Sequence, residues 1–274
     1  MLSLEELTNI SLSLAYDQSG CRYLQKLIET NDSFTNEYLF PKIKPSLMSI
    51  MNDAFGNYLI QKMIEKLNND NLNNLISIIN KNFLELAKNP QGTRVIQKLT
   101  ELSKCETLNN NMLSNALDLF KDNNGYHIIL KYSALHNKSS YVGRIVEDNL
   151  LEIAKNKFGC CALQKYLQTF PDEIIIRKII NYTTELIVDT YGNYVIQYVI
   201  SMNNQEYNIN IVEMFKNNIS FLSKQKFSSN VIERCFDYCK DSVKDLLINY
   251  ICDEKTVSNL LMDMYGNYGK VIIN

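Results

Sequence analysis

The sequence lacks the features that mark membrane proteins, secreted proteins and most enzymes. No apolar run among its 274 residues is long enough to cross a membrane. The segment after Met1, LSLEELTN, is acidic rather than basic, so we expect no signal or transit peptide. The two histidines, His127 and His136, accompany no nucleophile signature, and the sequence has no phosphate-binding loop. We therefore expect no enzyme, no small-molecule substrate and no membrane partner.

The seven cysteines form no regular framework. Cys235 and Cys239 lie one helical turn apart, but no histidine or further cysteine follows at zinc-ligand spacing. We expect reduced thiols in the cytosol, with no metal and no cofactor.

The chain also has no excess of positive charge: it contains 28 basic and 30 acidic residues, and its net charge is −2. Taken alone, this balance argues against nucleic acid, whose binders usually carry a basic face.

One short pattern recurs eight times along the chain. The copies are CRYLQ, NYLIQ, TRVIQ, YHIIL, CCALQ, NYVIQ, SNVIE and NYGKV, which begin at Cys21, Asn57, Thr93, Tyr126, Cys160, Asn193, Ser229 and Asn267. Successive starts are 36, 36, 33, 34, 33, 36 and 38 residues apart. A period of this size indicates a solenoid of stacked helical units. A stack of this kind suits a 274-residue chain that has only four prolines.

Each unit reads as helices joined by short loops. In the third unit the sequence predicts a short helix over 84–89, an interruption at 89–92, a helix over 93–103 and one further helix over 108–120. Counted from the first pentapeptide residue, positions three, four and seven are apolar and share a face that must be buried. They include Leu59, Ile60, Met63, Val95, Ile96, Leu99, Val195, Ile196 and Val199. No strand pattern occurs, and the predicted class is all-α.

The opposite face carries polar side chains at fixed positions. Positions one and five are one turn apart, so their side chains stand together. These pairs are Cys21/Gln25, Asn57/Gln61, Thr93/Gln97, Tyr126/Leu130, Cys160/Gln164, Asn193/Gln197 and Ser229/Glu233. Glutamine offers a donor and an acceptor to the edge of a base, whereas glutamate only accepts, which suits guanine. Position two provides side chains for stacking in most copies: Arg22, Tyr58, Arg94, His127, Cys161, Tyr194, Asn230 and Tyr268.

Position six is basic in six of the first seven copies. Its residues are Lys26, Lys62, Lys98, Lys131, Lys165, Tyr198 and Arg234. A solenoid aligns equivalent positions, so these side chains are expected to form a stripe that either contacts phosphates or is a solvated row.

The helices GNYLIQKMIE, GTRVIQKLTE, GNYVIQYVIS and SSNVIERCFD closely resemble those of the Pumilio/PUF RNA-binding proteins, and the order of the copies matches as well. The resemblance implies a right-handed α-solenoid, a crescent of eight three-helix repeats with the last incomplete. It implies one domain over 1–274, with base-reading helices starting near 20, 56, 92, 125, 159, 192, 228 and 266.

The resemblance also implies that the concave face binds single-stranded RNA, one base per repeat and antiparallel to the chain. The implied RNA-binding residues are Cys21, Arg22, Gln25, Asn57, Tyr58, Gln61, Thr93, Arg94, Gln97, Tyr126, His127, Cys160, Gln164, Asn193, Tyr194, Gln197, Ser229, Asn230, Glu233, Asn267 and Tyr268. The implied target is 5′-UGUANAUA in mRNA 3′ untranslated regions. The implied role is cytoplasmic repression, decay or localisation of mRNA, with deadenylase machinery recruited by the convex face.

Three repeats depart from the family pattern. Leu130 replaces a glutamine in the fourth and should abolish base discrimination there, and Cys161 replaces a flat side chain in the fifth. In the eighth, Gly269-Lys270 and Val271 replace two apolar residues and a glutamine, and we expect the third helix and the C-terminal cap to be missing. Two alternatives remain: a PUF-like nucleolar protein that binds structured RNA with little sequence preference, and an armadillo- or HEAT-like protein scaffold.

Overall fold

The computed structural model describes residues 4–102 and 105–252, and every regular element in that part of the chain is a helix. This confirms the predicted all-α class. The chain divides into two compact units, Met1–Val142 and Gly143–Asn274, with the boundary inside one helix. A single domain over 1–274 stays a prediction. No helix in the described ranges is long and apolar enough to cross a membrane.

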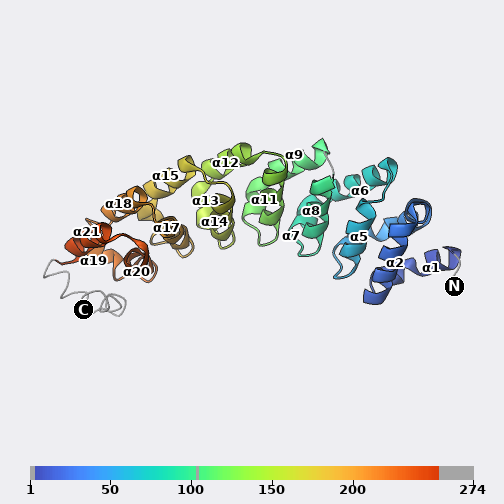
Figure 1. The fold of residues 1–274 in the computed structure, drawn as a ribbon, viewed down its shortest axis with the longest axis horizontal. Helices are drawn as coiled ribbons and strands as arrows, with labels where there is room; N and C mark the ends of the chain where they lie inside the picture. The colour runs from blue at the N-terminus through green and yellow to red at the C-terminus, as the bar shows by residue number, and fades with distance from the viewer. Residues whose placement is uncertain (1–3, 103–104, 253–274) are drawn as a thin grey trace. The chain divides into compact units, whose positions relative to one another are not determined.

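The first unit is a series of helices packed in chain order (Figure 1). Its elements are α1 (Leu4–Ala15), α2 (Gln18–Thr30), the π-helix η1 (Phe34–Leu39), α3 (Phe40–Ile43), the 3-10 helix η2 (Lys44–Ser46), α4 (Leu47–Met51), α5 (Gly56–Ile64), α6 (Asn69–Lys81), α7 (Phe83–Lys88), α8 (Gly92–Leu102), α9 (Glu106–Ser114), α10 (Ala116–Phe120) and α11 (Gly125–Leu135). Helix α2 packs on α5, α5 on α8 and α8 on α11. The repeated pentapeptides therefore lie on helices that are neighbours in space.

The second unit repeats this arrangement. Its elements are α12 (Ser139–Asp148), which contains the boundary, α13 (Leu150–Ala154), α14 (Gly159–Thr169), α15 (Glu173–Asn181), α16 (Thr183–Leu186), α17 (Gly192–Ser201), α18 (Gln205–Glu213), α19 (Ile219–Leu222), α20 (Ser228–Tyr238) and α21 (Asp241–Ile251). Helices α14, α17 and α20 form one packed row, and α15, α18 and α21 form another (Figure 1). We call α2, α5, α8, α11, α14, α17 and α20 the pentapeptide helices.

The predicted single helix over 108–120 is wrong, because the structure breaks it at Asn115 between α9 and α10. The Asn115 backbone is outside helical geometry, and its Nδ2 donates to the carbonyl of Asn111, 2.8 Å away. Asn82 and Asn149 donate to the carbonyls four residues before them in the same way. A side-chain amide that competes with the backbone ends one helix and lets the next begin at a new angle.

Short polar loops start the pentapeptide helices. In five loops an Asp or Asn Oδ1 accepts hydrogen bonds from two backbone N–H groups that precede or begin the helix. These residues are Asp53, Asn89, Asp122, Asn156 and Asp189. The glycine that follows permits close packing on the preceding short helix, because a Cβ on Gly56 would lie 2.6 Å from the carbonyl oxygen of Ile50.

The apolar positions of the pentapeptide helices form the core, as predicted. Leu59, Ile60 and Met63 of α5 are buried, and so are the corresponding residues of α8 and α17. The predictions for the eighth repeat, including Asn267, Tyr268, the helix near 266 and the missing cap, lie outside the described residues.

Candidate nucleic-acid interface

Position one is buried in six of the seven described pentapeptide helices. The six side chains are those of Cys21, Asn57, Thr93, Tyr126, Cys160 and Asn193. Ser229 in α20 is the exception and is partly exposed. Because each of these residues sits next to the loop that starts its helix, its polar atoms can bond to backbone carbonyls. Position one is therefore fixed in place before any ligand arrives.

Position five reaches back to position one. The Nε2 of Gln61 donates to Asn57 Oδ1 at 3.0 Å, and Gln197 donates to Asn193 Oδ1 at 2.9 Å. Gln25 and Gln97 make the equivalent bonds to Cys21 Sγ at 3.1 Å and Thr93 Oγ1 at 3.4 Å. The glutamines are half-buried, so each presents the rest of its amide to solvent in a fixed orientation.

The two asparagines are held further by their own amides. Asn57 Nδ2 donates to the carbonyls of Asp53 and Ala54, and Asn193 Nδ2 donates to those of Asp189 and Thr190. Both N–H groups of each asparagine are thus used within the protein. Its Oδ1, already bonded to the glutamine, retains a second lone pair.

The cysteines at position one act as neutral thiols. The Cys21 Sγ donates to the carbonyl of Phe55, 3.2 Å away, in the next repeat. Burial raises the pKa of Cys21 and raises the pKa of Cys160 to about 12. Both thiols therefore remain protonated at neutral pH, and a protonated thiol is a poor nucleophile. Among the described residues no group of His, Cys, Asp and Glu could hold a metal ion.

Position two points to solvent in all seven described helices. Its residues are Arg22, Tyr58, Arg94, His127, Cys161, Tyr194 and Asn230. The Nη1 of Arg94 donates to the hydroxyl of Tyr58 at 2.6 Å, and the guanidinium carbon lies 5.9 Å from the tyrosine ring centroid. In α5 and α8, therefore, the side chains at position two contact each other.

An open cleft lies between the first two pentapeptide helices. Its volume is about 480 Å³. The lining residues are Gln18, Cys21, Arg22, Gln25, Ala54, Phe55 and Tyr58. It thus joins positions one, two and five of α2 with position two of α5.

Helices α11 and α20 differ from the others. In α11 the ring centroids of Tyr126 and His127 are 3.9 Å apart. Leu130, at position five, has no polar side-chain atom. In α20 Ser229 Oγ donates to the carbonyl of Lys226, and the Glu233 carboxylate is exposed. At position five, therefore, α11 presents an apolar side chain and α20 presents an acceptor.

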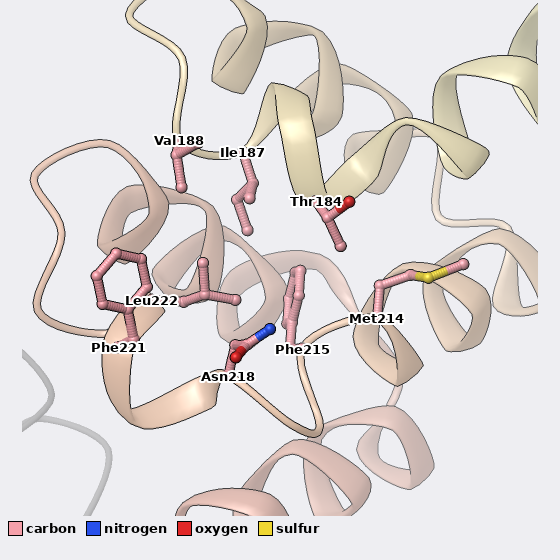
Figure 2. Close-up of a pocket in the computed structure, with 8 residues that line it drawn as sticks. All are labelled: Thr184, Ile187, Val188, Met214, Phe215, Asn218, Phe221 and Leu222. Carbon is pink, nitrogen blue, oxygen red and sulfur yellow. The ribbon is translucent and has the colours of Figure 1, made fainter.

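A second cavity, of about 250 Å³, lies in the second unit and is mostly apolar (Figure 2). Thr184, Ile187 and Val188 line one side, and residues of and near α19 line the other, including Phe221 and Leu222. None of its lining residues belongs to a pentapeptide. Its lining includes one amide, that of Asn218, and no charged side chain, so it offers few of the polar contacts that a nucleotide makes.

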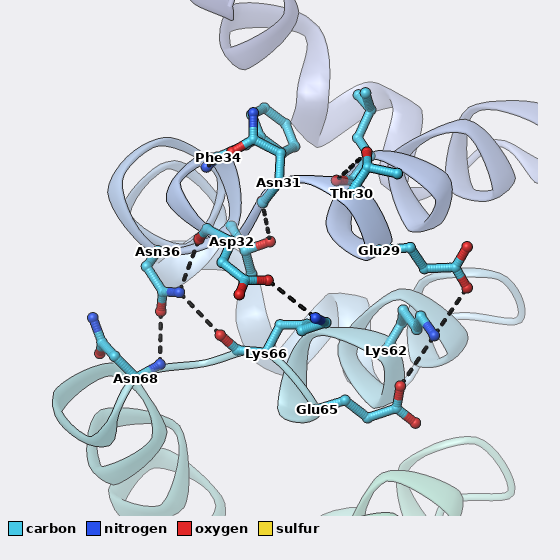
Figure 3. A network of polar contacts seen from close by, with 12 residues as sticks. Glu29, Thr30, Asn31, Asp32, Phe34, Asn36, Lys62, Glu65, Lys66 and Asn68 are labelled. Atoms are coloured by element: carbon cyan, nitrogen blue, oxygen red, sulfur yellow. Dashed lines mark hydrogen bonds and ion pairs between the residues drawn. The ribbon is translucent and has the colours of Figure 1, made fainter.

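Three lysines of the predicted basic stripe are bound to carboxylates. Lys62 Nζ lies 2.9 Å from Glu29 and 3.1 Å from Glu65 (Figure 3). Lys98 Nζ lies 2.7 Å from Glu65 and 3.8 Å from Glu101. Lys131 pairs with Glu101. In the first unit, therefore, these three lysines are not free cations. Sequence reasoning missed the glutamates, although each stands four residues after a position-five glutamine.

The other members of that stripe differ in exposure and partners. Lys26 and Lys165 are exposed, and Tyr198 is half-buried. The guanidinium carbon of Arg234 lies 4.5 Å from the Tyr238 ring centroid, so its charge faces an aromatic ring one turn along α20.

The chain is similar to known proteins over nearly its whole length. The family model described as NOP9-like PUF repeat domain matches residues 5–266. A Pumilio domain-containing protein of Schizosaccharomyces pombe is 34% identical over 266 residues, which cover 94% of this chain and 39% of that protein. Pumilio homolog 12 of Arabidopsis thaliana is 31% identical, covering 93% of this chain and 45% of that protein. The chain thus spans less than half the length of these relatives.

Solved structures with a similar fold include RNA complexes. The Puf4 RNA binding domain bound to the HO endonuclease RNA 3′ UTR recognition sequence matches with a TM-score of 0.77 and 32% identity, covering 93% of this chain and 84% of that chain. A Puf3 RNA binding domain bound to a 3′ UTR recognition sequence matches with a TM-score of 0.69 and 29% identity, covering 97% and 85%. The fold, the fixed pairs at positions one and five and these similarities lead to one conclusion: the chain belongs to the Pumilio/PUF family of RNA-binding proteins.

Proposed function

We propose that the pentapeptide helices read single-stranded RNA, one base per helix, through positions one, two and five. The residues are those named above for the seven described helices, together with Asn267 and Tyr268 of the eighth repeat. The observation that carries the proposal is the recurring arrangement in α2, α5, α8 and α17. In each, a buried position one holds a half-buried glutamine, and an exposed side chain stands beside them.

The fixed amides suit base edges. In α5, one N–H of Gln61 is used by Asn57, which leaves its other N–H and its Oε1 side by side. An adjacent donor and acceptor match the N3–H and a carbonyl of uracil, or N1 and N6–H of adenine. Position one then decides between uracil and adenine. Asn57 adds an acceptor lone pair, whereas Cys21 and Thr93 bond to backbone carbonyls of the next repeat.

These assignments give the target 5′-UGUANAUA, with the last repeat on the 5′ base. Ser229 with Glu233 selects G, and the Asn193/Gln197 and Asn57/Gln61 pairs select U. The pairs that begin with Cys160, Thr93 and Cys21 select A. Tyr126 with Leu130 selects no base, because neither side chain presents a donor–acceptor pair to a base edge.

The whole-protein role that we propose is post-transcriptional control of mRNA in the cytoplasm, by repression, decay or localisation. It draws support from the solved Puf4 and Puf3 domains, which are bound to 3′ UTR recognition sequences. Recruitment of deadenylase machinery and the absence of enzymatic activity are parts of the same proposal.

A second function has one observation in its favour, the match to a NOP9-like family model over residues 5–266. Under this alternative the protein acts in the nucleolus and binds structured RNA with little sequence preference. The paired Asn/Gln and Cys/Gln positions favour the first function, because shape recognition does not need them.

Selection from a random RNA pool separates the two functions. We expect enrichment of a UGUANAUA element in unpaired RNA, followed by a large loss of affinity when the element is placed in a hairpin stem. A matched pair of variants, Gln197→Ala in α17 and Gln205→Ala in α18, tests the site, because only the first should weaken binding. Enrichment of a hairpin without a common sequence would support the nucleolar alternative instead.

A further inference from the structure

The first three pentapeptide helices carry a glutamate at position nine. Glu29, Glu65 and Glu101 each lie four residues after the glutamine at position five, so they continue the same helical face one turn further. The equivalent residues in the next three helices are Ala134, Gln168 and Ser201, and the seventh helix has Asp237. A carboxylate beside an RNA-reading row is unexpected, because it repels phosphate.

These glutamates and the lysines at position six form one continuous ladder of ion pairs. It runs Glu29–Lys62–Glu65–Lys98–Glu101–Lys131 and links α2, α5, α8 and α11 in order. Figure 3 shows its first step, with the Lys62 ammonium between the carboxylates of Glu29 and Glu65. The ladder has no net charge, because its three ammonium groups are balanced by three carboxylates. It nevertheless contains three of the six basic residues at position six.

The ladder occupies the groups that would otherwise attract the RNA backbone. Lysine contacts to phosphate supply affinity that carries no sequence information, and they make binding dependent on salt. Position six stands one turn from the stacking residue at position two, so its lysines lie within a side chain's length of a strand that runs along the helices. Because Lys62, Lys98 and Lys131 are already paired with carboxylates, a phosphate would have to compete with a glutamate for each of them.

We propose that Glu29, Glu65 and Glu101 are specificity-determining residues that take the place of phosphates on Lys62, Lys98 and Lys131. By doing so they suppress sequence-independent RNA binding along the first unit and leave recognition to the base-edge contacts. This inference rests on the proposed function, because it assumes that RNA lies along these helices.

The test removes the three carboxylates and keeps their shape, in the variant E29Q/E65Q/E101Q. Binding to a UGUAUAUA RNA and to an oligouridine of equal length is measured across a salt series. With three lysines released, both RNAs should bind about tenfold more tightly at low salt, and the log–log salt slope should steepen by roughly 1–2. The gain should disappear at high salt.

A matched control changes the net charge by the same amount elsewhere. Glu147, Glu173 and Glu206 also pair with basic residues, Lys178 and Arg177, but they lie on α12, α15 and α18. The variant E147Q/E173Q/E206Q should bind like the wild type. An equal gain in this control would overturn the proposal, since it would show a general effect of protein charge.

A single substitution keeps the proposal testable if the triple variant folds poorly by circular dichroism. E101Q frees Lys131 and leaves Lys98 bound to Glu65, so the slope should steepen by about 0.7, the value for one phosphate on a single strand. An unchanged slope, or weaker binding in either variant, would overturn the proposal. If the wild type does not prefer UGUAUAUA over oligouridine, the base-reading assignment is overturned. The proposed role of the glutamates would still be supported if the variant bound both RNAs more tightly and with a steeper salt dependence.

Discussion

The two units carry the same helix pattern but differ in the charges beside it. In the first unit, glutamates at position nine bind the lysines at position six across four helices. In the second unit, α14 and α17 have uncharged residues at position nine, and Arg234 of α20 lies over the ring of Tyr238. The pentapeptide alone therefore does not define the electrostatics of the helix face that carries it. The residue at position nine, one turn after the pentapeptide, decides whether a basic residue at position six of the next helix is paired with a carboxylate.

The largest effect that we predict is a change of base preference in the second unit. Substituting Ser229→Asn together with Glu233→Gln copies the pair found in α17, and it removes the carboxylate that would accept from N1–H and N2–H of guanine. The variant should prefer UUUANAUA over UGUANAUA, which reverses a discrimination of roughly 1–3 kcal/mol. Competition binding measures this directly.

A change at the third base serves as the control, since Asn193 and Gln197 are untouched and discrimination there should persist. If the wild type and the variant rank the two RNAs in the same order, α20 does not read the second base.

The close packing of the pentapeptide helices can be compared in both units by glycine substitution. A Cβ on Gly56 in the first unit or on Gly159 in the second would collide with a backbone carbonyl of the preceding helix. Each change to alanine should cost about 1–3 kcal/mol of unfolding free energy in urea titrations, because backbone must shift. Gly143→Ala in α12 is the control, since the nearest atom there is the hydroxyl of Tyr166. An equal loss at Gly143 would contradict the packing argument.

The ion-pair ladder should make the first unit sensitive to acid. Two hydrogen bonds, the stronger from Lys98 and the other from Lys62, hold the pKa of the Glu65 carboxyl below its usual value. A lowered folded pKa adds stability above the unfolded pKa of about 4.3, and this stability is lost as the pH falls through the folded value.

We expect the difference in unfolding free energy between the wild type and Glu65→Gln, obtained from thermal melts, to be largest near pH 7 and to decrease as the pH falls below the unfolded pKa. Its size should stay within about 1 kcal/mol, because the ladder is partly exposed. Glu185→Gln, which breaks the isolated pair with Lys155 in the second unit, should give a smaller difference. A difference that is unchanged between pH 7 and pH 3 would exclude an ionic origin.

The smallest effect concerns the fourth helix. Exchanging the fifth base of UGUANAUA should change the affinity by well under the ~1–3 kcal/mol of a good bidentate contact, because Leu130 has no polar atom at the edge of the base. Measured affinities for the four possible RNAs should agree closely. A tenfold preference for one base would show that Tyr126 or His127 reads it.

Much of the architecture could be predicted from the sequence, because the same apolar spacing recurs from repeat to repeat. The apolar spacing of Leu59, Ile60 and Met63, repeated in other units, predicted the buried face and the all-α class correctly. The helix over 108–120 was predicted wrongly, because the competition between the Asn115 amide and the backbone is a local geometric event that apolar periodicity does not contain. The base-reading roles themselves stay predictions.

By itself, the sequence determined the repeat, its period, the face that must be buried and the residue types at positions one, two and five. These follow from side-chain chemistry at fixed helical spacing, which every copy repeats. Only the tertiary structure decided which of those groups are free. Stacking adjacent helices brings Lys62 to Glu29 and Lys98 to Glu65, residues more than 30 positions apart, and Coulomb attraction over about 3 Å then neutralises charges that the sequence shows as a basic stripe.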